Sequence, residues 1–137
     1  MSGFRPSFEY HQTNFVAAVA AATATQQDPI FVAPCACKVT AVSIVPQAAS
    51  TGDNTNTKNL NIVNKGASGA GTTEVGNLDL VSGTDLVAFD EKAIPLNATY
   101  TNGVSLSEGD VLSLQTEKVG TGVAVGPFIV SIDYVPV

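Results

Sequence analysis

The chain has 137 residues, of which 45% are hydrophobic and 13% are charged, and it contains no tryptophan. This length is typical of one domain with a core of its own. A formal net charge of -6, with the basic residues scattered along the sequence, disfavours a nucleic-acid partner, because phosphate binding needs a basic patch. The supply of Val, Thr, Ser, Asn and Gly favours an all-β domain, where these residues suit half-buried strands and turns.

The N-terminal residues 1–14 mix polar with aromatic side chains and follow neither a strand nor a helix period. We expect an extended N-terminal arm here, followed by one domain over residues 15–137. Two interpretations of the arm are open: a disordered terminus, or a segment that lays its aromatics on a partner or neighbouring subunit. On the second interpretation, the partner-binding residues are Phe4, Phe8, Tyr10 and Phe15.

The segment Phe15–Thr25 is ambiguous. Its alanines favour a helix, whereas Thr23 and Thr25 alternate as strand residues do, and we predict a strand. Its apolar part has the length of the hydrophobic region of a signal peptide, but no positively charged region precedes it. It is also shorter than the roughly 20 apolar residues that span a bilayer. We therefore expect a segment of the mature domain and no membrane partner.

Two strands joined by a long polar loop form the centre of the sequence. We predict one strand over Ala36–Val45, where the apolar pattern shifts phase between Val39 and Val42. This shift predicts burial on both faces or a β-bulge. The second strand is predicted over Lys58–Asn64. The loop between them, Gln47–Thr57, has no large apolar residue, so we expect it to face solvent or to make contacts through its polar groups.

Five further segments, each apolar or alternating and separated from the next by a turn, are also predicted to be strands. They are Asp28–Val32, Glu74–Val81, Leu86–Leu96, Val111–Glu117 and Phe128–Tyr134. Short strands at this spacing are typical of a β-sandwich or barrel. We predict a single-domain antiparallel β-sandwich, jelly-roll-like, with about eight strands.

The sequence offers no set of residues for catalysis or metal binding. The single histidine, His11, lies in the predicted arm, so a catalytic triad would draw its base from the least structured part of the chain. Cys35 and Cys37 are too close for an unstrained disulfide, and no further ligands complete a zinc set. We expect two reduced thiols that pack as small apolar residues, no cofactor and no enzymatic activity.

Five short segments resemble capsid decoration, or cement, proteins of tailed bacteriophages, especially those of actinobacterial phages. They are Val42–Pro46, Asn61–Gly66, Ala88–Leu96, Ser107–Leu112 and Val119–Gly122. The resemblance extends from about Lys38 to Val135. It implies a virion protein, made in the host cytoplasm, that binds the major capsid protein on the outer surface of the head and reinforces the shell.

The resemblance also implies a homo-oligomer, commonly a trimer, in which one heterologous interface repeats until it closes. The alternative function is a receptor- or glycan-binding β-sandwich module of a phage tail or fibre. That function would be supported by exposed aromatic residues on loops such as Gln47–Thr57, which has none.

Overall fold

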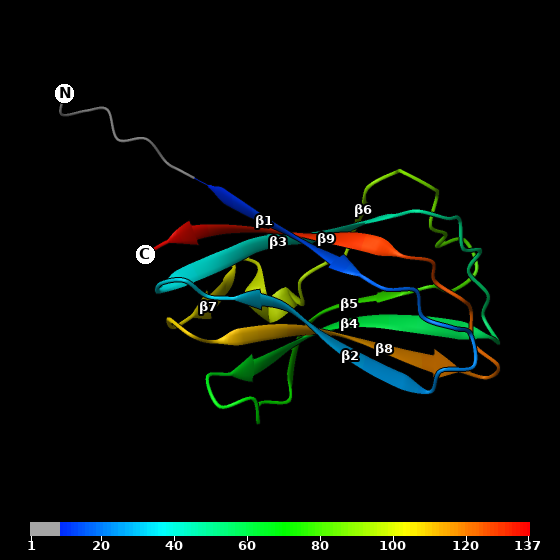
Figure 1. Ribbon diagram of the computed structural model, residues 1–137, viewed down its shortest axis with the longest axis horizontal. Helices are drawn as coiled ribbons and strands as arrows, with labels where there is room; N and C mark the ends of the chain where they lie inside the picture. Colours follow the sequence, from blue (N-terminus) through cyan, green and yellow to red (C-terminus); the bar gives the residue numbers. More distant parts are fainter. Residues whose placement is uncertain (1–8) are drawn as a thin grey trace.

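The computed structural model describes residues 9–137, and in them nine strands form two antiparallel sheets packed face to face (Figure 1). Sheet I contains β1 (Tyr10–Val16), β9 (Phe128–Pro136), β3 (Cys37–Pro46), β6 (Lys92–Ala93) and β7 (Val104–Leu106). Its order is β1-β9-β3, and both β6 and β7 pair with the far side of β3. Sheet II contains β2 (Thr25–Val32), β8 (Val111–Val119), β4 (Thr57–Gly66) and β5 (Thr73–Asp79), in this order.

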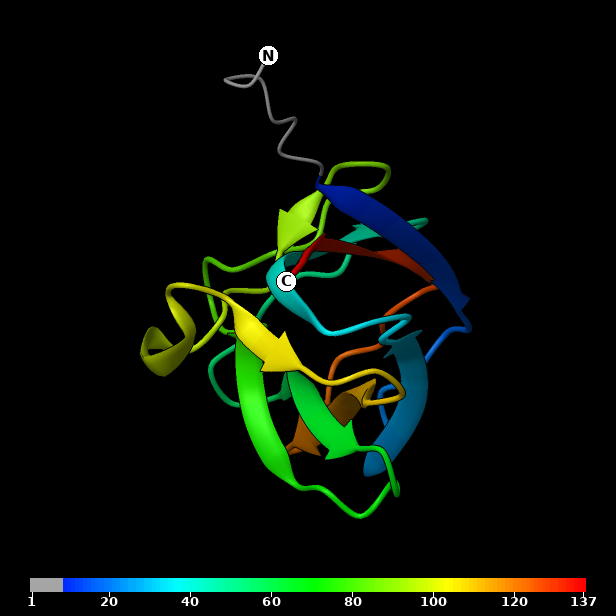
Figure 2. The same cartoon turned by 90° about the vertical axis from the view of Figure 1, so that its left-hand side faces the viewer.

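The connections between the strands follow the jelly-roll pattern. The two short strands β6 and β7 pair with opposite ends of β3 and together occupy one strand position. The chain crosses from one sheet to the other at every step except from β4 to β5 and from β6 to β7. Figure 2 shows the two layers from one end. The predicted all-β sandwich, with about eight strand positions, is confirmed.

The core lies between the sheets, because alternate side chains of each strand point inward. Sheet I contributes residues such as Ile44, Val130 and Ile132, and sheet II contributes Leu60 and Leu114, all fully buried. Burying each such side chain stabilises the fold by about 1.5–3 kcal/mol. The predicted phase shift in β3 is a β-bulge, since its register with β9 shifts between Val39 and Ala41.

The N-terminal strand β1 differs from the expected arm. It pairs with β9 from Tyr10 to Val16, so residues 10–14, which the sequence assigned to the arm, belong to sheet I. Residues 1–8 lie outside the described residues. The strand shows no apolar alternation because it is an edge strand whose central residues are polar on both faces.

The strand predicted over Phe15–Thr25 is wrong for most of its length. Residues 17–24 connect β1 to β2 and carry only an isolated bridge between Val19 and Val125. Lys58, fully buried in β4, holds this connection: its Nζ donates to the carbonyls of Ala20 at 3.0 Å, Ala21 at 3.3 Å and Thr23 at 3.0 Å. A distant lysine therefore decides the path of a segment whose own propensities are in conflict.

The strand predicted over Leu86–Leu96 is wrong for most of its length, because this segment forms only the two-residue strand β6, besides bridges at its two ends. In the loop Gln47–Thr57, Ser50 is buried, so this part of the loop makes contacts through polar groups, the second of its two expected roles. The backbone of Ser50 exchanges two hydrogen bonds with Leu86, and its hydroxyl donates to the carbonyl of Ala124 at 2.8 Å.

Candidate functional site

An apolar row crosses the outer face of sheet I. The strand registers place Phe15 of β1 opposite Ile129 of β9, and Ile129 opposite Val45 of β3. Outward side chains at matched positions lie side by side across a sheet. Three residues far apart in the sequence therefore form one continuous surface.

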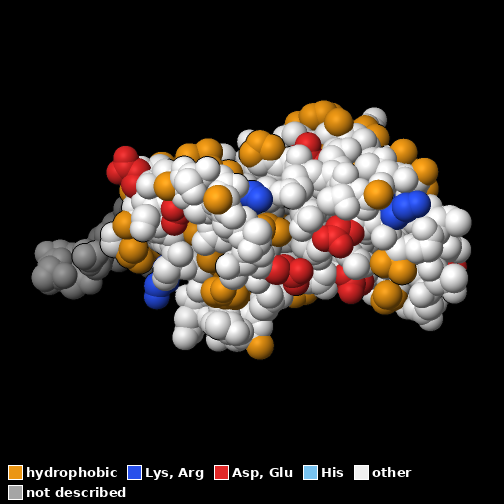
Figure 3. Space-filling view, turned by 90° about the horizontal axis from the view of Figure 1, so that it is seen from below, with side chains coloured by type: hydrophobic (Ala, Val, Ile, Leu, Met, Phe, Trp, Pro, Cys, Tyr) orange, Lys and Arg blue, Asp and Glu red, His pale blue; other side chains and the backbone are white. Residues whose placement is uncertain are grey.

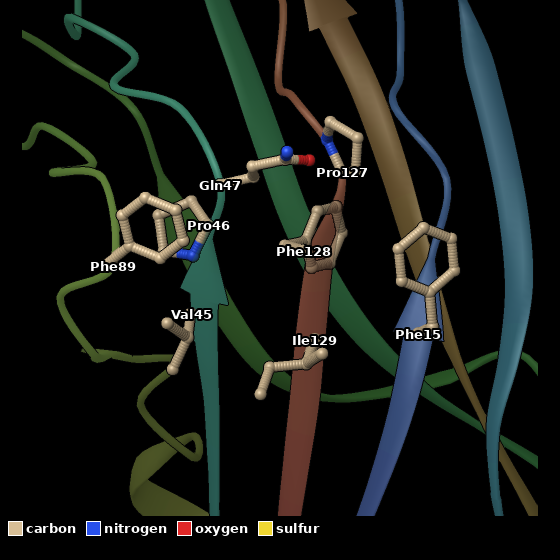
Figure 4. A pocket seen from close by; sticks show the side chains of 8 residues that line it. All are labelled: Phe15, Val45, Pro46, Gln47, Phe89, Pro127, Phe128 and Ile129. Atoms are coloured by element: carbon tan, nitrogen blue, oxygen red, sulfur yellow. The ribbon is translucent and has the colours of Figure 1, made fainter.

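A groove of about 270 Å³ opens over this row, between Phe15 on one side and Phe89 on the other (Figure 4). Its lining is apolar except for Gln47. The lining residues are Phe15, Val45, Pro46, Gln47, Phe89, Pro127, Phe128 and Ile129. Phe15 is 71% exposed and Phe89 is 77% exposed. Exposed apolar surface gathered in one place marks a binding site more often than scattered single residues do.

The backbone of Phe89 is strained. Its φ of 61° is the only positive value at a non-glycine position among the described residues. Its N–H donates to the carbonyl of Pro46 at 2.8 Å, which holds the turn against β3. A left-handed conformation costs a residue with a side chain about 1–2 kcal/mol. A large apolar side chain kept in a strained and exposed position indicates a functional use.

The rest of this face carries small and polar side chains. A second row across the strands consists of Thr13, Ser131 and Ser43. Ser43 donates to Oε2 of Glu91 at 2.7 Å, and His11 Nδ1 lies 2.5 Å from Oδ1 of Asp133. The carboxylates of Glu91 and Asp133 on this face are thus hydrogen-bonded within the chain.

The His11–Asp133 pair predicts a measurable titration. The hydrogen bond to Asp133 raises the pKa of His11 above its usual 6.5, the charge of Asp133 adds to this, and Glu9 contributes less. A raised pKa means that the pair stabilises β1 fully below pH 6.5 and that this contribution is lost as pH rises through the folded-state pKa. We expect an NMR titration midpoint of His11 above 6.5.

Two matched variants separate the causes. Asp133→Asn is expected to bring the pKa of His11 most of the way back to 6.5, whereas Glu9→Gln is expected to change it little. A wild-type midpoint at or below 6.5, or the same midpoint in Asp133→Asn, would contradict the arrangement.

The structure separates the predicted partner-binding residues. Tyr10 and Phe15 lie on opposite sides of β1, since an odd number of positions divides them. Tyr10 stacks on Tyr134 with ring centroids 5.6 Å apart, so it anchors β1, and Phe15 alone faces the groove. Phe4 and Phe8 lie outside the described residues. Phe89 was missed, because φ cannot be read from its sequence neighbourhood.

The outer face of sheet II carries acidic and uncharged polar side chains among scattered apolar ones (Figure 3). The strand registers align Gln27, Gln115, Asn61 and Asn77 in one row of carboxamides. Nδ2 of Asn77 donates to Oδ1 of Asn61 at 2.6 Å and to Oδ1 of Asp79 at 2.8 Å. Asn61 and Asn77 are thus bonded within this face, as is typical of a polar outer face. The candidate docking face is therefore the outer face of sheet I, defined by the groove residues.

The cysteines are free thiols, and Cys37 is buried in β3. Burial raises the pKa of the Cys37 thiol, which keeps it protonated and poorly nucleophilic. Within residues 9–137, no three or more His, Cys, Asp or Glu side chains gather in a way that could hold a metal ion. Over the same residues, no helix has the length and apolarity needed to cross a membrane.

The fold and the face together define a jelly-roll β-sandwich with an apolar groove on the outer face of one sheet and a row of carboxamides on the outer face of the other. No family model matches the sequence, and no curated protein matches it. Among solved structures, a chain from the structure of infectious bursal disease virus Gx strain is similar, with a TM-score of 0.38 and 13% sequence identity. The match covers 94% of this chain and 37% of that chain, so this protein spans little more than a third of its length.

Proposed function

We propose that this protein is a structural component of a virion, a capsid decoration or cement protein of a tailed bacteriophage. It binds the major capsid protein on the outer surface of the head and stabilises the shell. The observation that carries the proposal is the docking face, where exposed Phe15 and Phe89 flank an apolar groove on the outer face of sheet I.

The surface, more than the fold, supports this role. A jelly roll supports both capsid and lectin domains, so the fold alone does not select a function. The groove is small, and a single contact through it would be weak. Many copies on a repeating shell, associated as homo-oligomers such as the trimer implied by the sequence resemblance, would make such contacts effective together.

The alternative is a receptor- or glycan-binding module of a tail or fibre. Such a module would need free polar groups and an aromatic platform for sugars. The amides of Asn61 and Asn77 are bonded within the chain, and the exposed aromatics Phe15 and Phe89 border an apolar groove. This chemistry favours a protein partner.

The copy number in purified virions tests the proposal. We expect quantitative mass spectrometry to find the protein at a level comparable with the major capsid protein. A handful of copies per particle would contradict a cement role and support the tail or fibre alternative.

Binding to heads that lack the protein tests the face itself. Phe15→Ser is expected to weaken binding by about tenfold or more, as truncation of an interface aromatic does. Val32→Ser, at an exposed position of β2 outside the groove, is the matched control and should bind as the wild type does. Equal binding by Phe15→Ser and the wild type would show that the groove face does not bind the head.

Truncation is not a clean alternative to this substitution. A deletion of residues 1–14 would remove Tyr10–Asn14 from β1 and with them most of its pairing with β9. A deletion that tests the N-terminal segment without damaging sheet I must therefore stop at Phe8.

A further inference from the structure

The outer edge of β1 is an unprotected strand edge. In sheet I, β1 pairs with β9 on one side and has no strand on the other side among the described residues. Its sequence, YHQTNFV, contains no Pro, Lys, Arg, Asp or Glu, and its register with β9 has no shift. Natural edge strands usually carry such residues or bulges, because an open row of N–H and C=O groups recruits further strands.

The neighbouring edge strand β2 shows the contrast. It contains Asp28 and Pro29, and its register with β8 shifts between Pro29 and Phe31. A proline cannot donate to an added strand, and a bulge turns the edge away from one. Of two edges on the same side of the sandwich, one is therefore protected and the other is open.

The open edge is continuous with the docking face. Phe15 belongs to β1 and also lines the groove, so a strand added beside β1 would bring its own outward side chains next to Phe15. Main-chain hydrogen bonds would supply affinity, as in other cases of strand addition. The exposed ring of Phe15, which stands between the added strand and the groove, would favour an apolar or aromatic neighbour and would leave the groove itself open.

Residues 1–8 of this sequence meet that requirement, with Phe4 and Phe8. In an extended strand these two phenylalanines, an even number of positions apart, would share one face. Within one chain, a tight turn would not bring these phenylalanines to Phe15. A reversal through a two-residue turn at Phe8 and Glu9 would set Phe4 opposite Thr13, short of Phe15 at the far end of β1. A second copy has no such restriction.

We propose that residues 1–8 of a second copy add as a strand to the outer edge of β1 and place an aromatic side chain beside Phe15. The contact is heterologous, since the donor segment and the acceptor edge are different surfaces, and repetition around a three-fold axis closes it. This inference rests on the homo-oligomer of the proposed function and assigns the surface that forms it.

Three variants test the contact. One deletes residues 2–8 and so lacks the donor while keeping β1 whole. Thr13→Lys places a charge at the exposed centre of β1 and so blocks the acceptor. Gln27→Lys makes the same change at an exposed position of β2 and is the matched control. Circular dichroism and thermal melting check that each variant folds.

Light scattering after size exclusion gives the mass of each protein over a range of concentrations. We expect an oligomer for the wild type and for Gln27→Lys. The deletion and Thr13→Lys should each weaken self-association by about tenfold or more. Mixing the two should produce a one-to-one complex, because the deletion variant offers an intact edge and Thr13→Lys offers an intact segment.

A monomeric wild type, an unchanged mass after deletion, or equal effects of Thr13→Lys and Gln27→Lys would overturn the inference. No complex in the mixture of folded variants would overturn the heterologous contact. Head binding is a separate readout. An oligomer that forms as expected but does not bind heads refutes the proposed function alone, and a monomer that binds heads refutes the inference alone.

Discussion

Phe89→Asn is expected to stabilise the free protein and to weaken its attachment to the head. The φ of 61° at this position suits asparagine, which tolerates the left-handed conformation much better than phenylalanine does. Little packing is lost, because Phe89 is 77% exposed. We expect the free energy of unfolding to rise by about 1 kcal/mol. The affinity for heads should fall by about 2 kcal/mol, or roughly thirtyfold, if Phe89 is an interface hot spot.

Urea denaturation and head binding measure the two effects. Phe15→Asn is the matched control, since Phe15 is also an exposed groove residue but lies in a regular strand. It should lose affinity without gaining stability. A Phe89→Asn protein that is less stable than the wild type would show that the side chain packs within the fold. Unchanged head binding would show that its strain serves no docking role.

Lys58→Met is expected to lower the free energy of unfolding by about 2 kcal/mol. Three backbone carbonyls, of Ala20, Ala21 and Thr23, lose the hydrogen bonds donated by Nζ. Hydrogen bonds to a charged group contribute about 1.5–3 kcal/mol each. Relief from burying the ammonium group offsets part of this loss, so the net effect is smaller than the sum of the bonds.

Urea denaturation measures the change, and Lys65→Met, at a partly exposed position of β4, should remain within about 0.5 kcal/mol of the wild type. Hydrogen exchange should quicken at the Lys118 amide, which donates to the carbonyl of Ala24 at the end of the same connection. Equal stabilities of the Lys58→Met and Lys65→Met proteins would contradict the bracing role of Lys58.

The pH dependence of Lys58 has a definite sign. Burial, with the charge of Lys118 adding to it, lowers the pKa of Lys58 below its usual 10.5. The unfolded chain therefore binds more protons than the folded one between the folded-state pKa and 10.5, and stability rises with pH in that window. Lys58→Met should lack this rise relative to the wild type.

Several elements could be predicted from local patterns alone. The inward residues of β9, including Val130 and Ile132, alternate with less buried ones, and this period-two pattern is visible in the sequence. The bulge in β3 was likewise visible as a phase shift. β1 was not visible, since an edge strand with polar residues on both faces has no apolar period to read.

The sequence by itself determined an all-β domain and the places of its longer strands β2, β3, β4, β5, β8 and β9, because strand alternation and turn chemistry are properties of neighbouring residues. Only the tertiary structure decided the docking face, which joins Phe15, Val45 and Ile129 through the registers of three strands. It also decided the strained backbone of Phe89, held by Pro46. These features depend on hydrogen bonds between residues distant in the chain, which no local pattern records.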